Sequence, residues 1–161
     1  MRGHASADPR DPGTTNGAGA SGAPDVPQTQ TVSFGVSGGA EAPRHARTVM
    51  SSHLRHIDPG VASDAELIVS ELVTNSVRHA AVGPDRRVTV HLVLLHDHLR
   101  ITVTDPGGDL QPRLLSKSPD GLGGHGLRLV EMLSTTWGVG RDAVGATQVW
   151  CDLVLDPGRD R

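Results

Sequence analysis

The sequence predicts an α+β fold, a two-layer α/β sandwich in which a mixed, mainly antiparallel sheet carries its helices on one face. Two observations lead to this fold class. Runs of alternating polarity, typical of strands, mostly follow one another along the chain, and two segments of helical periodicity lie between the first run and the next. Consecutive strands usually lie side by side, and helices with one apolar stripe each pack on a single face of the sheet.

The first part of the domain is expected to hold a strand and a helix. Residues Thr31 to Val36 alternate in polarity, with Val32, Phe34 and Val36 on one face, and predict a strand. Pro43 suits the first position of a helix, and apolar residues recur at helical spacing as far as Ile57. We interpret Asp58-Pro59-Gly60 as the end of this helix.

A second helix is the most strongly signalled element. Ser63 and Glu66 have the spacing of a capping box, which predicts that the helix begins at Ser63. Gly83-Pro84-Asp85 is expected to end it. Its apolar stripe is predicted to face the sheet and consists of Ala65, Ile68, Val69, Leu72, Val73, Ser76 and Ala80.

The remaining elements are four strands and a short helix. Segments 87–95 and 99–104 are β-rich and predict a hairpin closed by His96-Asp97-His98. A long loop rich in Pro, Gly and Ser follows, and we expect its residues 108–123 to be mobile without a ligand. A helix is predicted over 127–133, and strands over 137–141 and 147–155.

Composition limits the protein class. The chain has 161 residues and a net charge of −3, which suits one domain and disfavours direct binding of nucleic acid. We expect a disordered tail at 1–28, a domain at 29–156 and a short tail at 157–161. Neither a membrane span nor a secretory signal is evident, and the single cysteine, Cys151, fits a reducing cytoplasm and a buried position.

Glu71 and Asn75 lie one helical turn apart, at the edge of the apolar stripe. An amide oxygen suits Mg²⁺, and a neighbouring carboxylate could accept a proton during phosphoryl transfer. A solvated helix face is the alternative for this pair alone.

Asp105 continues the strand parity of Leu99, Ile101 and Val103, so it is predicted to point toward the buried side of the sheet. A carboxylate there needs a hydrogen-bond donor, and the exocyclic amine of adenine is one. The following glycines would let a flat ring approach the backbone. The alternative is that Asp105 only starts a turn.

Four glycines at 121, 123, 124 and 126 precede the last helix, whose amino terminus could hold phosphate oxygens. Their spacing matches a dinucleotide fingerprint, but the preceding residues are predicted to be loop instead of strand, so a Rossmann fold is excluded. A flexible loop is the alternative. The nine histidines show no ligand spacing for a metal, and no oxyanion motif surrounds Ser70 and His79.

In order, these motifs resemble those of the GHKL (Bergerat) ATPase superfamily. Segment 71–80, ELVTNSVRHA, is similar to its N box, Asp105-Pro106-Gly107 to its first glycine box and Gly124-His125-Gly126-Leu127 to its second. Gly145-Ala146-Thr147 resembles the last box. The resemblance covers roughly residues 31–155. Within the superfamily, the size of the chain and the sequence of its N box resemble those of the anti-sigma-factor serine/threonine kinases. The resemblance thus implies a Bergerat fold.

The resemblance also implies a role for each motif. Glu71 would be the catalytic base, Asn75 would ligate Mg²⁺ and Asp105 would bind adenine. The remaining positions implied to line the nucleotide site are His79, Gly107, Gly124, His125, Gly126, Leu127 and Thr147. One departure is Asp109, because the first glycine box commonly reads D-x-G-x-G and would have a glycine at this position.

The function implied is a cytoplasmic Mg-ATP-binding protein that phosphorylates an anti-anti-sigma (STAS-type) partner on serine or threonine. It would also act as an anti-sigma factor that binds a sigma factor, and a homodimer is typical of that family. The alternative is a non-catalytic, ATP-dependent protein-binding module of the same fold. ATP hydrolysis without a partner is a third option.

Overall fold

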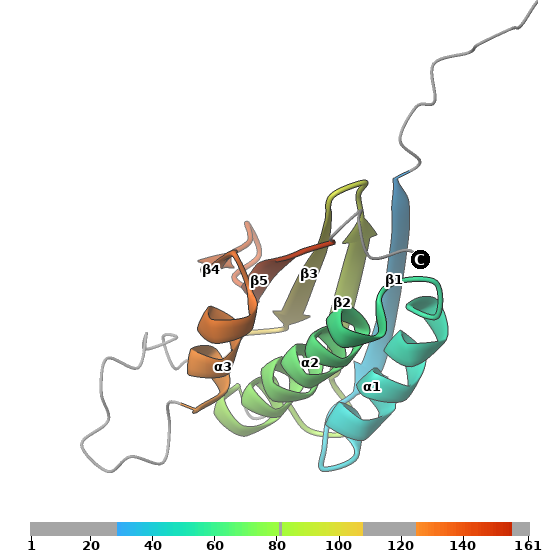
Figure 1. The fold of residues 1–161 in the computed structure, drawn as a ribbon. Helices are drawn as coiled ribbons and strands as arrows, with labels where there is room; N and C mark the ends of the chain where they lie inside the picture. Colours follow the sequence, from blue (N-terminus) through green and yellow to red (C-terminus); the bar gives the residue numbers. More distant parts are fainter. Residues whose placement is uncertain (1–28, 81, 108–124, 156–161) are drawn as a thin grey trace, which may run out of the picture.

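The structure, a computed structural model, describes residues 29–80, 82–107 and 125–155. The expectations for both tails and for the loop at 108–123 lie outside these residues. Five strands and three helices follow one another along the described chain (Figure 1). They are β1 (Gln30–Ser37), α1 (Ala42–His53), α2 (Pro59–His79), β2 (Arg87–Leu94), β3 (His98–Asp105), α3 (His125–Leu133), β4 (Thr136–Arg141) and β5 (Thr147–Val154).

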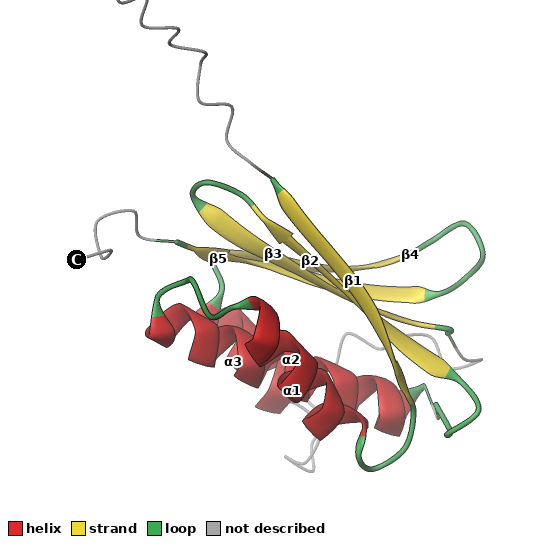
Figure 2. Cartoon of the chain, turned by 90° about the vertical axis from the view of Figure 1, so that its right-hand side faces the viewer, coloured by secondary structure: helices red, strands yellow, loops and turns green. Residues whose placement is uncertain are grey.

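The strands form one sheet in the order β1-β2-β3-β5-β4, and all four strand pairings are antiparallel. The three helices lie on one side of this sheet (Figure 2), with α2 in contact with both α1 and α3. The two-layer α/β sandwich predicted from the sequence is therefore confirmed, but the described sheet is antiparallel throughout instead of mixed. The helices bury their apolar stripes against one sheet face because neither layer can cover its own apolar surface alone.

The core lies between the two layers and follows the predicted strand parity. Alternate residues of β2 and β3 are buried there, and the apolar stripe of α2 covers them from Ala65 to Val73. Cys151 is fully buried, as predicted, and burial raises the pKa of its thiol to about 12. The buried apolar residues of the sheet are Val36, Val88, Val90, Leu92, Leu99, Ile101, Val103, Cys151 and Leu153.

The predicted boundary between the first two helices is wrong. Helix α1 ends at His53, so Ile57 lies outside it, and α2 begins at Pro59 instead of Ser63. The Asp58 carboxylate caps α2 by accepting hydrogen bonds from the amides of Gly60 and Val61, at 2.9 and 3.1 Å. An aspartate followed by proline starts a helix as readily as it ends one, because both residues suit the positions before the first turn.

Ser63 and Glu66 consequently lie inside α2 and form no capping box. Glu66 instead accepts a hydrogen bond from the Ser51 hydroxyl of α1, so its carboxylate joins the two helices. At the other end α2 stops at His79, and the Ala80 amide donates to the Ser76 carbonyl.

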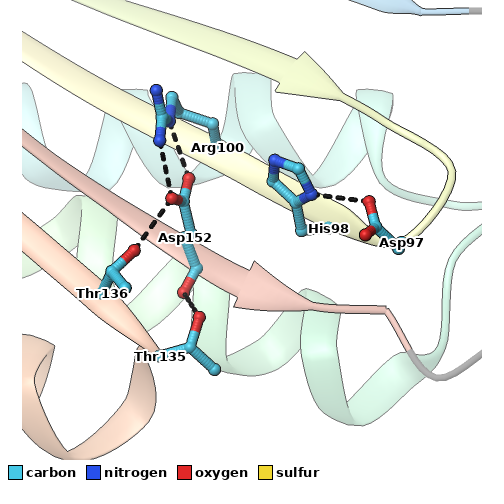
Figure 3. Close-up of polar contacts among 6 residues, drawn as sticks. All are labelled: Asp97, His98, Arg100, Thr135, Thr136 and Asp152. Atoms are coloured by element: carbon cyan, nitrogen blue, oxygen red, sulfur yellow. Dashed lines mark hydrogen bonds and ion pairs between the residues drawn. The ribbon is translucent and has the colours of Figure 1, made fainter.

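The second face of the sheet, opposite the helices, is largely polar. Asp152 on β5 accepts two hydrogen bonds of 2.7 Å from the Arg100 guanidinium on β3 and one of 2.9 Å from Thr136 (Figure 3). These contacts, led by the bonds from Arg100, lower the pKa of Asp152. Arg100 also lies over the Trp150 ring, 4.9 Å from its centre. Polar pairs therefore join β3, β5 and β4 across this face.

No helix in the described part of the chain is both long and apolar enough to cross a membrane.

Candidate functional site

Glu71 and Asn75 lie on the side of α2 that faces the start of α3. Both side chains are half-buried, and Gly126 lies directly against them. A Cβ atom placed on Gly126 would be 2.8 Å from Asn75 Nδ2 and 3.1 Å from Glu71 Oε2. The structure therefore brings the predicted N box and the second glycine box into contact, and a side chain at position 126 would displace the ends of Glu71 and Asn75.

Helix α3 directs its amino terminus to the same place. It begins at His125, and Val130 is fully buried in the core while Leu127 and Leu129 pack against it. These apolar residues fix the helix on the sheet and on α2. The first-turn amides of a helix have no partners within the helix, so they are free to bind an anion next to Glu71 and Asn75.

Asp105 ends β3 with its side chain on the helix side, as the parity predicted, and it is 7% exposed. Its Oδ1 accepts a 2.9 Å hydrogen bond from the Gly107 amide. Within the described part of the chain its other oxygen, Oδ2, makes no hydrogen bond. The residue therefore does form a turn, and one carboxylate oxygen remains for a ligand.

Thr147 is the cross-strand partner of Asp105, on the first position of β5. The turn before it is held by Asp142, whose carboxylate accepts hydrogen bonds from the amides of Val144 and Ala146 at 3.0 and 2.8 Å. The first and the last predicted boxes thus lie side by side because β3 and β5 pair antiparallel, although about forty residues separate them in the sequence.

Gly107 packs against the same turn. Its φ is 71°, in the left-handed region that favours glycine, and a Cβ there would lie 2.5 Å from the Gly145 carbonyl oxygen. Gly145 itself has a φ of 86°. Two backbone turns are therefore in direct contact beside Asp105, and both depend on glycine.

Arg86 is the residue at this site that the sequence analysis missed. Its guanidinium donates hydrogen bonds from Nη2 to the carbonyls of Pro106 and Gly107, at 3.3 and 3.2 Å. Nothing in the sequence separates Arg86 from the adjacent Arg87. The contact becomes visible only when the start of β2 and the end of β3 meet at one edge of the antiparallel pair.

Helix α2 connects the group around Glu71 and Asn75 with the group around Asp105. It contacts α3 on one side and strands β3 and β5 on another, so both groups lie at the interface between the helices and the sheet. Predicted positions 79 and 125 lie at the end of α2 and the start of α3, but their side chains are outside the description. Gly124 lies outside the described residues altogether.

The Asn75 amide oxygen fits Mg²⁺, because this hard cation takes one or two protein oxygens together with water and phosphate. The Glu71 carboxylate lies against the same glycine as Asn75, where it can accept a proton. Among the described residues, no three His, Cys, Asp or Glu side chains are grouped closely enough to hold a metal by themselves. A metal held by Asn75 would complete its coordination with oxygens from water or phosphate.

The chain is similar to known proteins in sequence and in fold. Residues 38–151 match the family described as histidine kinase-like ATPase domain. A curated relative, serine-protein kinase RsbW from Listeria monocytogenes serovar 1/2a (strain ATCC BAA-679 / EGD-e), is 37% identical over 82 residues, which cover 44% of this chain and 52% of the relative. The chain thus spans about half the length of this relative.

Two solved structures share the fold. The RsbU and RsbW domains of Rv1364c from Mycobacterium tuberculosis match with a TM-score of 0.59 and 20% identity, over 78% of this chain and 32% of that one. The SiaB–SiaC complex from Pseudomonas aeruginosa matches with a TM-score of 0.50 and 15% identity, over 77% of this chain and 89% of that one. At these identities the likeness concerns the fold alone. The family match over most of the described residues confirms the predicted superfamily, and the chain belongs to the histidine kinase-like ATPase domain family.

Proposed function

We propose that this chain binds ATP together with Mg²⁺ and transfers the γ-phosphoryl group to a serine or threonine of an anti-anti-sigma (STAS-type) protein. The observation that carries the proposal is the contact of Gly126 with Glu71 and Asn75, which places a helix amino terminus beside a carboxylate and an amide oxygen. A related protein named as a serine-protein kinase supports the same activity. An anti-sigma role, with a sigma factor as second partner, is part of this proposal.

ATP would lie between α2, α3 and the Asp105 turn. Asp105 Oδ2 would accept a hydrogen bond from the exocyclic amine of adenine, and Thr147, paired with Asp105, lies on the same side of the sheet. The first-turn amides of α3 would bind phosphate oxygens. Asn75 would hold Mg²⁺, which when bound neutralises charge on the phosphates.

Glu71 would act as the general base. Its carboxylate would accept the proton of the attacking serine or threonine hydroxyl as the hydroxyl oxygen bonds to the γ-phosphorus. The bond from that phosphorus to the β-γ bridging oxygen breaks, and ADP leaves. The half-buried position of Glu71 beside Asn75 keeps the proton acceptor next to the metal ligand.

The test is phosphorylation of candidate STAS-type proteins with radiolabelled ATP and Mg²⁺. Wild type should label a serine or threonine, and Glu71→Gln should lower the rate at least ~100-fold while ATP still binds. Glu66→Gln is a matched control on the same helix, because Glu66 contacts Ser51 of α1. It should transfer phosphate at the wild-type rate.

The other functions give different results. If ATP binds and changes the affinity for a partner, but no STAS-type protein is ever labelled, the chain is a non-catalytic ATP-dependent binding module. If ATP is hydrolysed at a measurable rate without a partner, the activity is that of a stand-alone ATPase.

A further inference from the structure

Arg86 precedes β2 and lies close to the Asp105 turn. Hydrogen bonds to two other chain segments fix its backbone. Its amide donates to the Gly83 carbonyl at 3.1 Å, and its carbonyl accepts from the Gly38 amide at 2.9 Å. Gly38 packs so closely against Val82 that no side chain fits at position 38. The start of β2 is therefore held to the end of β1 and to the turn after α2, and Arg86 extends from a fixed base.

The Arg86 side chain crosses from this base to the first glycine box. One nitrogen, Nη2, donates to the carbonyls of both Pro106 and Gly107. The amide of Gly107 donates in turn to Asp105 Oδ1. A chain of hydrogen bonds thus runs from the guanidinium through the peptide group between Pro106 and Gly107 to the carboxylate that would bind adenine.

We propose that Arg86 is a positioning residue that selects adenine by fixing the turn on which Asp105 lies; this inference rests on the proposed nucleotide site. With Oδ1 held by Gly107, rotation of the carboxylate is restricted and Oδ2 has one direction in which to accept a hydrogen bond. A guanidinium suits this role because it is always charged and presents its donors in a rigid plane. Arg86 itself does not contact the base.

A purely structural role for Arg86 predicts something different from a positioning role. If Arg86 only stabilised the fold, its removal would weaken the binding of every nucleotide to the same extent. If it positions Asp105, its removal should affect mainly the contact to the exocyclic amine of adenine. Inosine triphosphate separates these cases, because it carries a carbonyl oxygen where ATP carries that amine and otherwise has the same ribose and phosphates.

The experiment is calorimetric titration of ATP and of inosine triphosphate, each with Mg²⁺, into wild type, Arg86→Ala, Arg86→Lys and Arg87→Ala. Wild type should prefer ATP by about tenfold or more, since the wrong base leaves a buried carboxylate unpaired. In Arg86→Ala the ratio of the affinities for ATP and inosine triphosphate should fall at least about threefold, because ATP binds more weakly. Arg87→Ala should keep the preference, because Arg87 is exposed like Arg86 but makes no hydrogen bond to this turn among the described residues. Arg86→Lys should keep most of the preference because it retains a cationic donor.

Thermal unfolding of each variant shows whether the fold is intact. An unchanged preference in Arg86→Ala, or an equal loss of affinity for both nucleotides, would overturn the positioning role while leaving the nucleotide site in place. If wild type itself does not prefer ATP, the assignment of Asp105 to adenine fails as well, and Asp105→Asn should then bind both nucleotides as wild type does.

Discussion

Gly126 lies so close to Asn75 that a Cβ atom on the glycine would come within 2.8 Å of the Asn75 side-chain nitrogen. The contact joins the first turn of α3 to the fourth and fifth turns of α2. The groups that would have to move for a larger residue are the ends of Asn75 and Glu71, which are the residues proposed for metal binding and proton transfer. A substitution at Gly126 therefore affects the site more than the core.

We predict that Gly126→Ala weakens ATP binding by about tenfold, which corresponds to about 1.4 kcal/mol, because Asn75 and Glu71 must move aside. The free energy of unfolding should fall by less than about 1 kcal/mol, since flexible side-chain ends can yield. Calorimetric titration and urea unfolding measure the two effects. Gly140→Ala on β4 is the control, because its added Cβ has no atom of the described residues within 4 Å apart from its own chain neighbours. Equal affinities in both variants would contradict the prediction.

Asp105→Asn should cost about 1–3 kcal/mol of ATP binding, because a charge-assisted hydrogen bond to adenine becomes a neutral one. The Asn side chain can still accept from the Gly107 amide, so the turn itself should persist. Titration with ATP and Mg²⁺ is the measurement, and Asp85→Asn, exposed in the turn before β2, is the control. Unchanged affinity in Asp105→Asn would remove the adenine role.

The two glycines beside Asp105 should differ in how much alanine destabilises the fold. Gly107→Ala introduces a Cβ 2.5 Å from the Gly145 carbonyl oxygen at a positive φ, and we expect a loss of about 2–4 kcal/mol in unfolding free energy. Gly145→Ala has the same kind of φ but open space around its Cβ, so about 1–2 kcal/mol is expected. Denaturant unfolding of both variants gives the order, and the reverse order would contradict the geometry.

The ion pair on the second sheet face should make stability depend on pH. Arg100 lowers the folded-state pKa of Asp152 below its ordinary value of 3.8. The ion pair therefore makes its full contribution to the free energy of unfolding at pH values above 3.8. It is lost as the pH falls through the folded-state pKa. Arg100→Ala should therefore destabilise the protein by about 1–2 kcal/mol at pH 7, since Arg100 is partly exposed, and by less below about pH 4.

Urea unfolding of wild type and Arg100→Ala between pH 3 and 7 provides the test (about the range in which this carboxyl titrates). Arg55→Ala is a suitable control, because Arg55 is exposed and forms no ion pair with the described residues. A stability difference for Arg100→Ala that does not change with pH would show that packing on Trp150, instead of charge, is what was lost.

Cys151 should be unreactive in the folded protein. Burial raises the pKa of its thiol to about 12, so very little thiolate forms at neutral pH, and the side chain is fully buried. Iodoacetamide should label the protein only after denaturation, which mass spectrometry detects. Rapid labelling of the native chain would show that β5 opens on the timescale of the reaction.

Much of the fold could be predicted from local patterns. Strand parity predicted which residues of β3 face the core, including Asp105, because side chains alternate strictly across a strand. Helical periodicity predicted the buried stripe of α2 and placed Glu71 and Asn75 at its edge. The helix boundary at Asp58 was wrong because Asp-Pro is compatible with either end of a helix, and only packing of the two helices decides between them.

The polarity patterns of the sequence by themselves determined the sandwich, and the order of motifs determined the family and most candidate site residues. Both are readable because each pattern involves only a few neighbouring residues. Only the tertiary structure decided how they meet. It placed Gly126 on Asn75, paired Asp105 with Thr147 and brought Arg86 to the carbonyls of Pro106 and Gly107. Such contacts depend on strand pairing and helix packing between distant segments, and nothing in the local sequence separates Arg86 from Arg87.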